Sequence, residues 1–107
     1  MVTIMTDIRL KLGAESQWDS TMRERMSKVD KQPGWISGQL LAPADQPHAR
    51  VIVGTWNSRD DWQRWHDDPV FARTRRTLDA LAAEPARHAW HEVVLDASKA
   101  RDLDAKG

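Results

Sequence analysis

The sequence predicts an α+β domain of the ferredoxin-like kind, with a four-stranded antiparallel sheet covered by helices on one face. Apolar and polar residues alternate in four segments, as they do in half-buried strands. In two other segments apolar residues recur every three or four positions, as in amphipathic helices. The segments follow the order β-α-β-β-α-β, which is the split pattern of this fold. With 107 residues, the chain is predicted to form one domain around one core.

The first strand is predicted over residues 2–12, where one parity is apolar and the other is polar or charged. Gly13 breaks this alternation. The first helix is predicted over residues 14–31, because apolar side chains recur there at helical intervals. Its apolar stripe consists of Trp18, Met22, Met26 and Val29. Pro33 and Gly34 are expected to end the helix.

Two further strands are predicted over residues 35–42 and 50–56. The connection over 43–48 has the sequence PADQPH, which is typical of a turn, and so short a link joins antiparallel neighbours. A fourth strand is predicted over 88–95. We therefore place the domain at residues 1–96, followed by a charged tail over 97–107 that is expected to fray.

Two helix starts follow the third strand in quick succession. Ser58, with Asp61 three residues later, fits a capping box that satisfies free backbone amides. Asp68 followed by Pro69 fits a second start, with Pro at a position that needs no N–H. The prediction is a short helix and then a longer one that ends at Pro85. The apolar face of the longer helix is predicted to contain Val70, Phe71, Thr74, Leu78, Leu81 and Ala82.

The sheet face away from the helices is also expected to be apolar. Met5, Trp35 and Leu41 are placed there, together with one parity each of residues 51–56 and 90–95. An apolar patch of this size on a small domain usually meets a partner. Packing two sheets face to face would bury it, so we predict a homodimer.

The composition excludes several classes of function. Sixteen basic and sixteen acidic residues cancel, which argues against a general electrostatic grip on nucleic acid or on an anionic membrane. No apolar run approaches the roughly 18 residues of a membrane span. The absence of cysteine excludes a thiolate site and fits a cytoplasmic protein. His88 and His91 should point to opposite faces of a strand, so we expect no metal site.

Any aromatic role falls to indole, because the chain has six tryptophans, one phenylalanine and no tyrosine. Trp56, Trp62 and Trp65 lie within ten positions of one another, around the two helix starts. Trp56 and Trp65 fit two roles, as anchors of the core and as walls of a pocket. If the protein has a pocket, we expect this stretch to form its wall.

Two polar side chains near these tryptophans also fit two roles each. Arg75 lies about 40° from Phe71 around the helix. Its guanidinium is placed either to reach water past the apolar stripe or to hold a phenolate or carboxylate at a pocket mouth. His66 is either an exposed residue at a helix end or, if it points inward, a base suited to a phenol.

With this order of elements, the sequence resembles the antibiotic biosynthesis monooxygenase family of dimeric α+β barrels over roughly residues 4 to 95. The motifs that carry the resemblance are Pro33-Gly34-Trp35, Thr55-Trp56-Asn57-Ser58 and the segment WQRWHDDPVF over 62–71. In one branch of the family, an electron-rich, phenolate-like substrate reduces oxygen without metal or flavin. The resemblance implies that the protein deprotonates, desolvates and orients such a substrate in an apolar cavity.

Two branches of the family differ from this chain at specific positions. In the haem-degrading branch, the counterpart of Trp65 presses on the haem. The axial histidine of that branch falls at Arg75, and its pocket asparagine falls at or near Ile8. In the anthrone-oxygenase branch Trp56 matches, but the polar asparagine falls at Ile52 and the tyrosine has no counterpart.

The first hypothesis is thus a cofactor-independent monooxygenase for a quinol- or anthrone-like aromatic molecule. The second is a non-catalytic or stress-response module that binds a small aromatic ligand. The third is haem binding or degradation with altered ligation, through His66. The catalytic candidates are Trp65, Arg75 and His66, and the substrate-binding candidates are Trp56, Trp62, Phe71 and Ile8.

Overall fold

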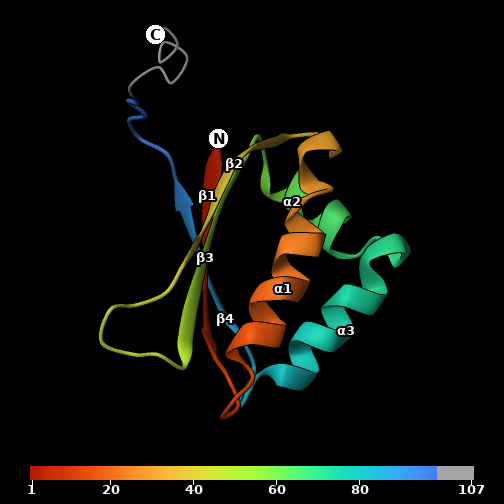
Figure 1. The fold of residues 1–107 in the computed structure, drawn as a ribbon. Helices are drawn as coiled ribbons and strands as arrows, with labels where there is room; N and C mark the ends of the chain where they lie inside the picture. Colours follow the sequence, from red (N-terminus) through yellow and green to blue (C-terminus); the bar gives the residue numbers. More distant parts are fainter. Residues whose placement is uncertain (99–107) are drawn as a thin grey trace, which may run out of the picture.

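The structure is a computed structural model, and it describes residues 1–98. Three helices lie together on one face of a sheet (Figure 1). The strands are β1 Val2–Arg9, β2 Trp35–Leu41, β3 Ala49–Trp56 and β4 Arg87–Glu92. The helices are α1 Glu15–Met26, α2 Arg59–His66 and α3 Ala72–Leu81, with short 3₁₀ turns η1 Val29–Lys31 and η2 Pro69–Phe71.

The four strands form one sheet in the order β2-β3-β1-β4, and all neighbours are antiparallel. Strand β1 lies between β3 and β4, so Ile4 is opposite both Gly54 and Trp90. Strands β2 and β3 form the predicted hairpin around the turn over 43–48. The predicted ferredoxin-like order of elements is confirmed.

The even-numbered side chains of β1 face the helices and are the centre of two buried clusters. The first cluster consists of Ile4, Val29, Trp56, Trp65 and Phe71. The second consists of Ile8, Leu10, Ala14, Trp18 and Met22. Because α1 contributes Trp18 and Met22, its predicted apolar stripe is the face that covers the sheet.

Two strands end earlier than predicted, because they run out of hydrogen-bonding neighbours. Arg9 is opposite the first residue of β3, and beyond it only a single bridge joins Leu10 to Ala82. Leu12 is consequently 89% exposed, although its parity predicted a buried side chain. Strand β4 ends opposite Val2, which leaves Val94 exposed. The predicted tail over 97–107 falls almost wholly outside the described residues.

The two helical predictions over 14–31 and from Pro69 onward were wrong where 3₁₀ turns replace α-helix. Helix α1 stops at Met26, and Val29 is buried from within η1. Val70 was predicted to share the apolar face with Phe71, but it is 76% exposed. The angle of 100° per residue does not apply within η2, because a 3₁₀ turn has about three residues per turn.

Trp35 faces the helices, which corrects its predicted place on the opposite face of the sheet. A β-bulge between Trp35 and Ser37 shifts the register of β2 by one residue, which reverses the faces of the side chains that precede it. The indole of Trp35 packs edge-on against that of Trp56, with ring centroids 5.2 Å apart. It also covers Gly38, where an added Cβ would lie 2.3 Å from the ring.

The helix-free face of the sheet carries an apolar strip across three strands. Met5 on β1 is opposite Val53 on β3, and Leu41 on β2 is opposite Val51. Met5 and Leu41 are 38% and 42% exposed. The parts of the predicted apolar face on β1, β2 and β3 are therefore present, without Trp35. The predicted contribution of residues 90–95 was wrong, because Trp90 is opposite Ile4 on the helix side and β4 ends at Glu92.

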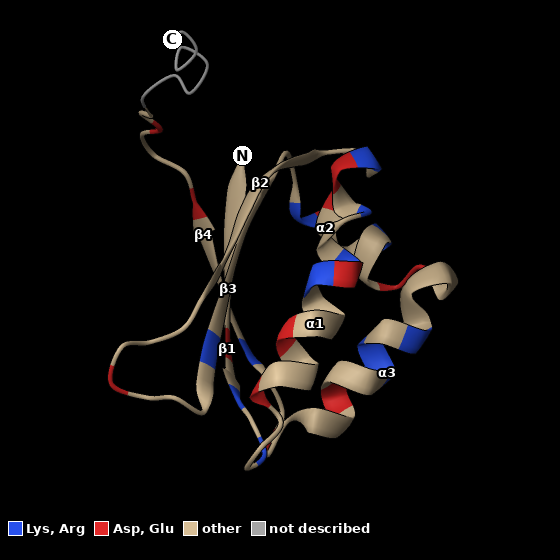
Figure 2. Cartoon of the chain, viewed as in Figure 1, with Lys and Arg blue, Asp and Glu red and all other residues tan. Residues whose placement is uncertain are grey.

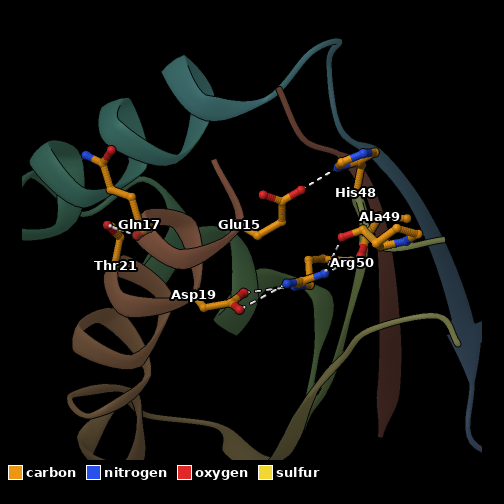
Figure 3. A network of polar contacts seen from close by, with 8 residues as sticks. Glu15, Gln17, Asp19, Thr21, His48, Ala49 and Arg50 are labelled. Atoms are coloured by element: carbon orange, nitrogen blue, oxygen red, sulfur yellow. Dashed lines mark hydrogen bonds and ion pairs between the residues drawn. The ribbon is translucent and has the colours of Figure 1, made fainter. Parts of the chain in front are cut away.

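Ion pairs fix α1 against the sheet. The guanidinium of Arg50 donates to both carboxylate oxygens of Asp19, over 2.8 and 3.0 Å, and His48 pairs with Glu15 (Figure 3). These hydrogen bonds to Asp19 raise the pKa of Arg50. Acidic and basic residues are mixed along all three helices (Figure 2). Within the described residues, no helix is both long and apolar enough to span a membrane.

Candidate functional site

A cavity of about 610 Å³ lies between the sheet and the helix layer. Its walls come from β1, β3 and β4 on one side and from α1, α2 and α3 on the other. The volume falls within the range of about 300–1,000 Å³ that is usual for small-molecule sites. The lining is mainly apolar, so the few charged and ionisable side chains in it define its chemistry.

Three tryptophans form a continuous aromatic wall. Trp56, at the end of β3, is 1% exposed, and its ring lies 5.4 Å from that of Trp65 on α2. Trp35 completes the row from β2. Side chains of this size set the shape of the cavity, because they bury large areas in fixed orientations. Trp56 and Trp65 are thus core residues that also line the cavity, so the two predicted positions, in the core and in a pocket wall, are not alternatives.

Six of the seven predicted site residues line this cavity. They are Ile8, Trp56, Trp62, Trp65, His66 and Arg75. Phe71 does not line it: its ring packs behind Trp65, with centroids 6.0 Å apart. The helical angle linked Phe71 correctly to the buried face, but Trp65 stands between it and the open space. The role of Phe71 in substrate binding stays a prediction.

The start of α2 determines where Trp65 and His66 point. Ser58 Oγ accepts from the Asp61 backbone N–H at 3.2 Å and donates to the Asp61 carboxylate at 2.9 Å. Gly34, in the first family motif, has φ +86°, and an added Cβ there would lie 2.3 Å from Asp61. Glycine is therefore required at this position of the motif, because any side chain would collide with Asp61 at the start of α2. One turn later, α2 ends at His66.

His66 is half-buried and stacks on Trp62, with ring centroids 4.5 Å apart and planes 16° from parallel. Burial lowers its pKa, and the positive charges of Arg25 and Arg75 lower it further. The imidazole is therefore neutral at neutral pH and has a free lone pair. Arg75 Nη1 donates to the backbone carbonyl of His66, which fixes α3 to the end of α2.

Sequence reasoning missed a second histidine at the cavity. His88, on β4, lines the cavity, and its Nδ1 is hydrogen-bonded to the buried hydroxyl of Thr6 at 2.9 Å. The centroid of its ring lies 6.4 Å from that of His66. Partial burial lowers the pKa of His88. The sequence contained a signal for this position: His88 is two residues before Trp90, so both side chains lie on the same face of the strand. Within residues 1–98, no three His, Cys, Asp or Glu side chains gather as metal ligands.

Sequence reasoning also missed Arg25, on α1. It is 4% exposed and lines the cavity, with its guanidinium 4.3 Å from the centre of the Trp65 ring. Nη1 donates to the Phe71 carbonyl at 3.2 Å and to the Thr74 hydroxyl at 3.1 Å. Burial, followed by the charge of Arg75, lowers its pKa to about 10. It lies three residues after Met22 and therefore on the same face of α1.

Known proteins share both the sequence pattern and the architecture. The model of the antibiotic biosynthesis monooxygenase family matches residues 1–77. A mycobilin-producing heme oxygenase of Mycobacterium tuberculosis is 28% identical over 89 residues, which cover 83% of this chain and 85% of that protein.

Solved structures agree in fold. SnoaB, a cofactor-independent oxygenase from Streptomyces nogalater, superposes with a TM-score of 0.79 at 21% identity, covering 92% of this chain and 97% of that one. A protein from Nitrosomonas europaea assigned to antibiotic biosynthesis monooxygenases gives a TM-score of 0.82 at 18% identity, covering 89% and 100%. With the family model matching most of its length, this chain belongs to the antibiotic biosynthesis monooxygenase family.

Proposed function

We propose that the protein is a cofactor-independent monooxygenase that oxidises an electron-rich aromatic molecule of the anthrone or quinol class. The observation that carries this proposal is that one indole-walled cavity holds a neutral histidine and two arginines. An apolar aromatic wall suits a flat substrate, while the polar groups suit its deprotonated oxygen.

The reaction requires only the substrate and oxygen. For an anthrone, loss of a proton gives an electron-rich enolate, which transfers an electron to O₂. Recombination forms a carbon–oxygen bond, and loss of water gives the quinone. One oxygen atom enters the product, and the other leaves as water with the two hydrogens that the substrate carbon loses. The protein's part is to take the first proton, stabilise the anion and exclude water.

Each of the six predicted residues that line the cavity has a role in this scheme. His66 takes the proton, because its lowered pKa leaves it neutral at neutral pH. Arg75 stabilises the resulting oxyanion by charge and hydrogen bonding. Trp56, Trp62 and Trp65 hold the aromatic plane, and Ile8 closes the apolar floor on β1.

Oxygen uptake with 1,8-dihydroxyanthrone tests the proposal. We expect consumption above the uncatalysed rate without added metal or flavin, with one quinone formed per O₂. The His66→Gln variant should lose roughly a hundredfold in kcat/KM, the lower end of the contribution of a general base. Arg75→Ala should also lose rate, whereas Arg73→Ala, on the solvent side of α3 and paired with Glu24, should not. Unchanged turnover in Arg75→Ala would remove Arg75 from the mechanism.

The same experiment addresses the proposal of a binding module. Stoichiometric quenching of tryptophan fluorescence by the anthrone, without oxygen uptake, would identify a protein that sequesters an aromatic ligand. The cavity wall contains most of the tryptophans, so occupancy should change their emission.

Haem is a second candidate substrate, and the observation that favours it is the heme oxygenase relative. Haem iron binds imidazole, and His66 or His88 in the cavity lining would hold it if haem were bound. Addition of haemin should then shift the Soret band, and His66→Gln should reverse the shift. An unshifted spectrum would eliminate this candidate.

We further propose that two copies of the chain pair through the helix-free sheet face. The apolar strip of Met5, Leu41, Val51 and Val53 supports this arrangement, since face-to-face packing of sheets removes such a strip from water.

A further inference from the structure

Arg25 is a buried cation with part of its hydrogen-bonding capacity unused. Both of its hydrogen bonds to protein come from Nη1. Within residues 1–98, neither Nε nor Nη2 has a protein acceptor. These two nitrogens form one edge of the guanidinium, and that edge matches the two oxygens of a carboxylate. Because Arg25 lines the cavity, a ligand can reach this edge.

No carboxylate among the described residues balances this charge by direct contact. Within residues 1–98, neither Arg25 nor Arg75 forms an ion pair, although three other arginines do. The two arginines repel each other, and Asp79 attracts Arg25 without contacting it. The histidine beside them is neutral. Asp79 and Glu84 also line the cavity, but neither forms an ion pair with Arg25. The buried charge of Arg25 therefore has no directly bound counter-ion in the described part of the chain, and burial makes such a charge costly unless an anion binds to it.

Arg25 is held rigidly in this position. Its guanidinium lies over Trp65 at 4.3 Å and over Phe71 at 5.6 Å from the ring centres, while Nη1 is held by η2 and α3. A cation that is already oriented and desolvated loses little further freedom when it binds an anion. This explains the position of Phe71, which supports Arg25 and Trp65 from behind the cavity wall.

We propose that the ligand of this cavity is an aromatic acid, with a carboxylate beside the reacting ring held by Arg25 and Arg75. This assignment rests on the proposed function for the site, and it adds the substrate's permanent charge. A neutral phenol would leave Arg25 without a directly bound counter-ion until it was deprotonated. A carboxylate neutralises one charge on binding, leaving the other for the oxyanion that forms during the reaction.

A matched pair of ligands tests this proposal on the unmodified protein. The probes are 1-hydroxy-2-naphthoate and its methyl ester, which share a ring system and differ in charge at neutral pH. Titrations followed by tryptophan fluorescence and calorimetry should give a dissociation constant at least about tenfold lower for the acid, as expected for a charged hydrogen-bonded contact. Equal affinities, or tighter binding of the ester, would overturn the proposal.

Variants identify the residues responsible. In Arg25→Gln the preference for the acid should fall to about onefold, and Arg25→Lys should retain part of it, because lysine keeps the charge but not the paired N–H groups. Arg75→Gln should reduce the preference, and Arg73→Gln on the same helix should leave it unchanged. If Arg25→Gln does not fold, the comparison of acid with ester in the unmodified protein and in Arg75→Gln still decides the matter.

The outcomes separate this inference from the proposed function. Preferential binding of the acid without any oxygen uptake would support the anion site and contradict the monooxygenase. Oxygen uptake with neutral anthrones, together with no preference for the acid, would support the monooxygenase and contradict the anion site.

Discussion

At the scale of single residues, His66 connects the chemistry of the cavity to the stability of the fold. Its ring is stacked on Trp62 and is half removed from water, close to two guanidinium groups. Burial and the charges of the two guanidinium groups disfavour the protonated ring. The same features that keep His66 neutral at neutral pH should therefore lower the free energy of unfolding in acid.

We predict that acid weakens the fold through His66. An unfolded histidine titrates near pH 6.5, and folding lowers the pKa of His66, so the unfolded chain binds more protons between the two values. The free energy of unfolding should be highest above about pH 6.5 and should fall as the pH drops through the folded pKa. Urea titrations at several pH values between these limits should show a smaller loss in His66→Gln than in the unmodified protein. An identical loss in both would contradict the prediction.

The sequence pattern predicted most of the aromatic residues of the cavity wall but only some of its charged and ionisable residues. Trp56, Trp65 and His66 were identified because they cluster beside two helix starts. Arg25 was not, because a charged side chain on an apolar stripe usually reaches water along its stem. Its guanidinium is kept inside by contacts with the rings of Trp65 and Phe71 and by hydrogen bonds to η2 and α3, all of which come from segments distant in sequence.

At the scale of elements, α2 matters most, because its eight residues carry Trp62, Trp65 and His66. So short a helix is not stable by itself and depends on its start and on packing. Its start is joined to β2 by the hydrogen bond from the Asn57 N–H to the Gly34 carbonyl, 2.8 Å long. Loss of order at this start should therefore affect the cavity wall.

We predict that Ser58→Ala destabilises the protein by about 1 kcal/mol, the usual cost of losing an N-cap side chain. Urea denaturation provides the measurement. Affinity for the aromatic probe should fall as well, since the same helix places Trp65 and His66. Ser20→Ala on the solvent side of α1 is the control and should change neither quantity. A Ser58→Ala variant as stable as the unmodified protein would show that the cap is dispensable.

The order and type of elements were predictable from periodicity and caps, whereas local departures from regular geometry were not. The β-bulge after Trp35 moves that indole to the helix side, and η2 turns Val70 into solvent. Both depend on pairing and packing with segments distant in sequence. The spacing of apolar residues along one segment, with a period of 2.0 or 3.6, carries no information about such contacts.

At the scale of the whole molecule, the two sheet faces have different uses. The helix-covered face encloses the cavity, while the opposite face leaves Met5 on the central strand 38% exposed within an apolar strip. In a pair of molecules joined by their outer faces, the two cavities would lie on the far sides. Each site would then be built from one chain, and pairing would stabilise the sheet that supports it.

We predict that Met5→Glu abolishes pairing, raising the dissociation constant of the dimer at least about a hundredfold, because a two-fold interface would bury two unpaired carboxylates. Sedimentation equilibrium should show a dimer for the unmodified protein and a monomer for the variant. Val70→Glu is a matched control, since it adds the same charge at an exposed apolar residue on the helix side, and it should remain dimeric. If Met5→Glu stays dimeric, or if the unmodified protein is monomeric at micromolar concentration, the outer face is not the interface. Ligand affinity in a folded Met5→Glu monomer should be nearly unchanged, because no cavity residue comes from the second copy in this arrangement.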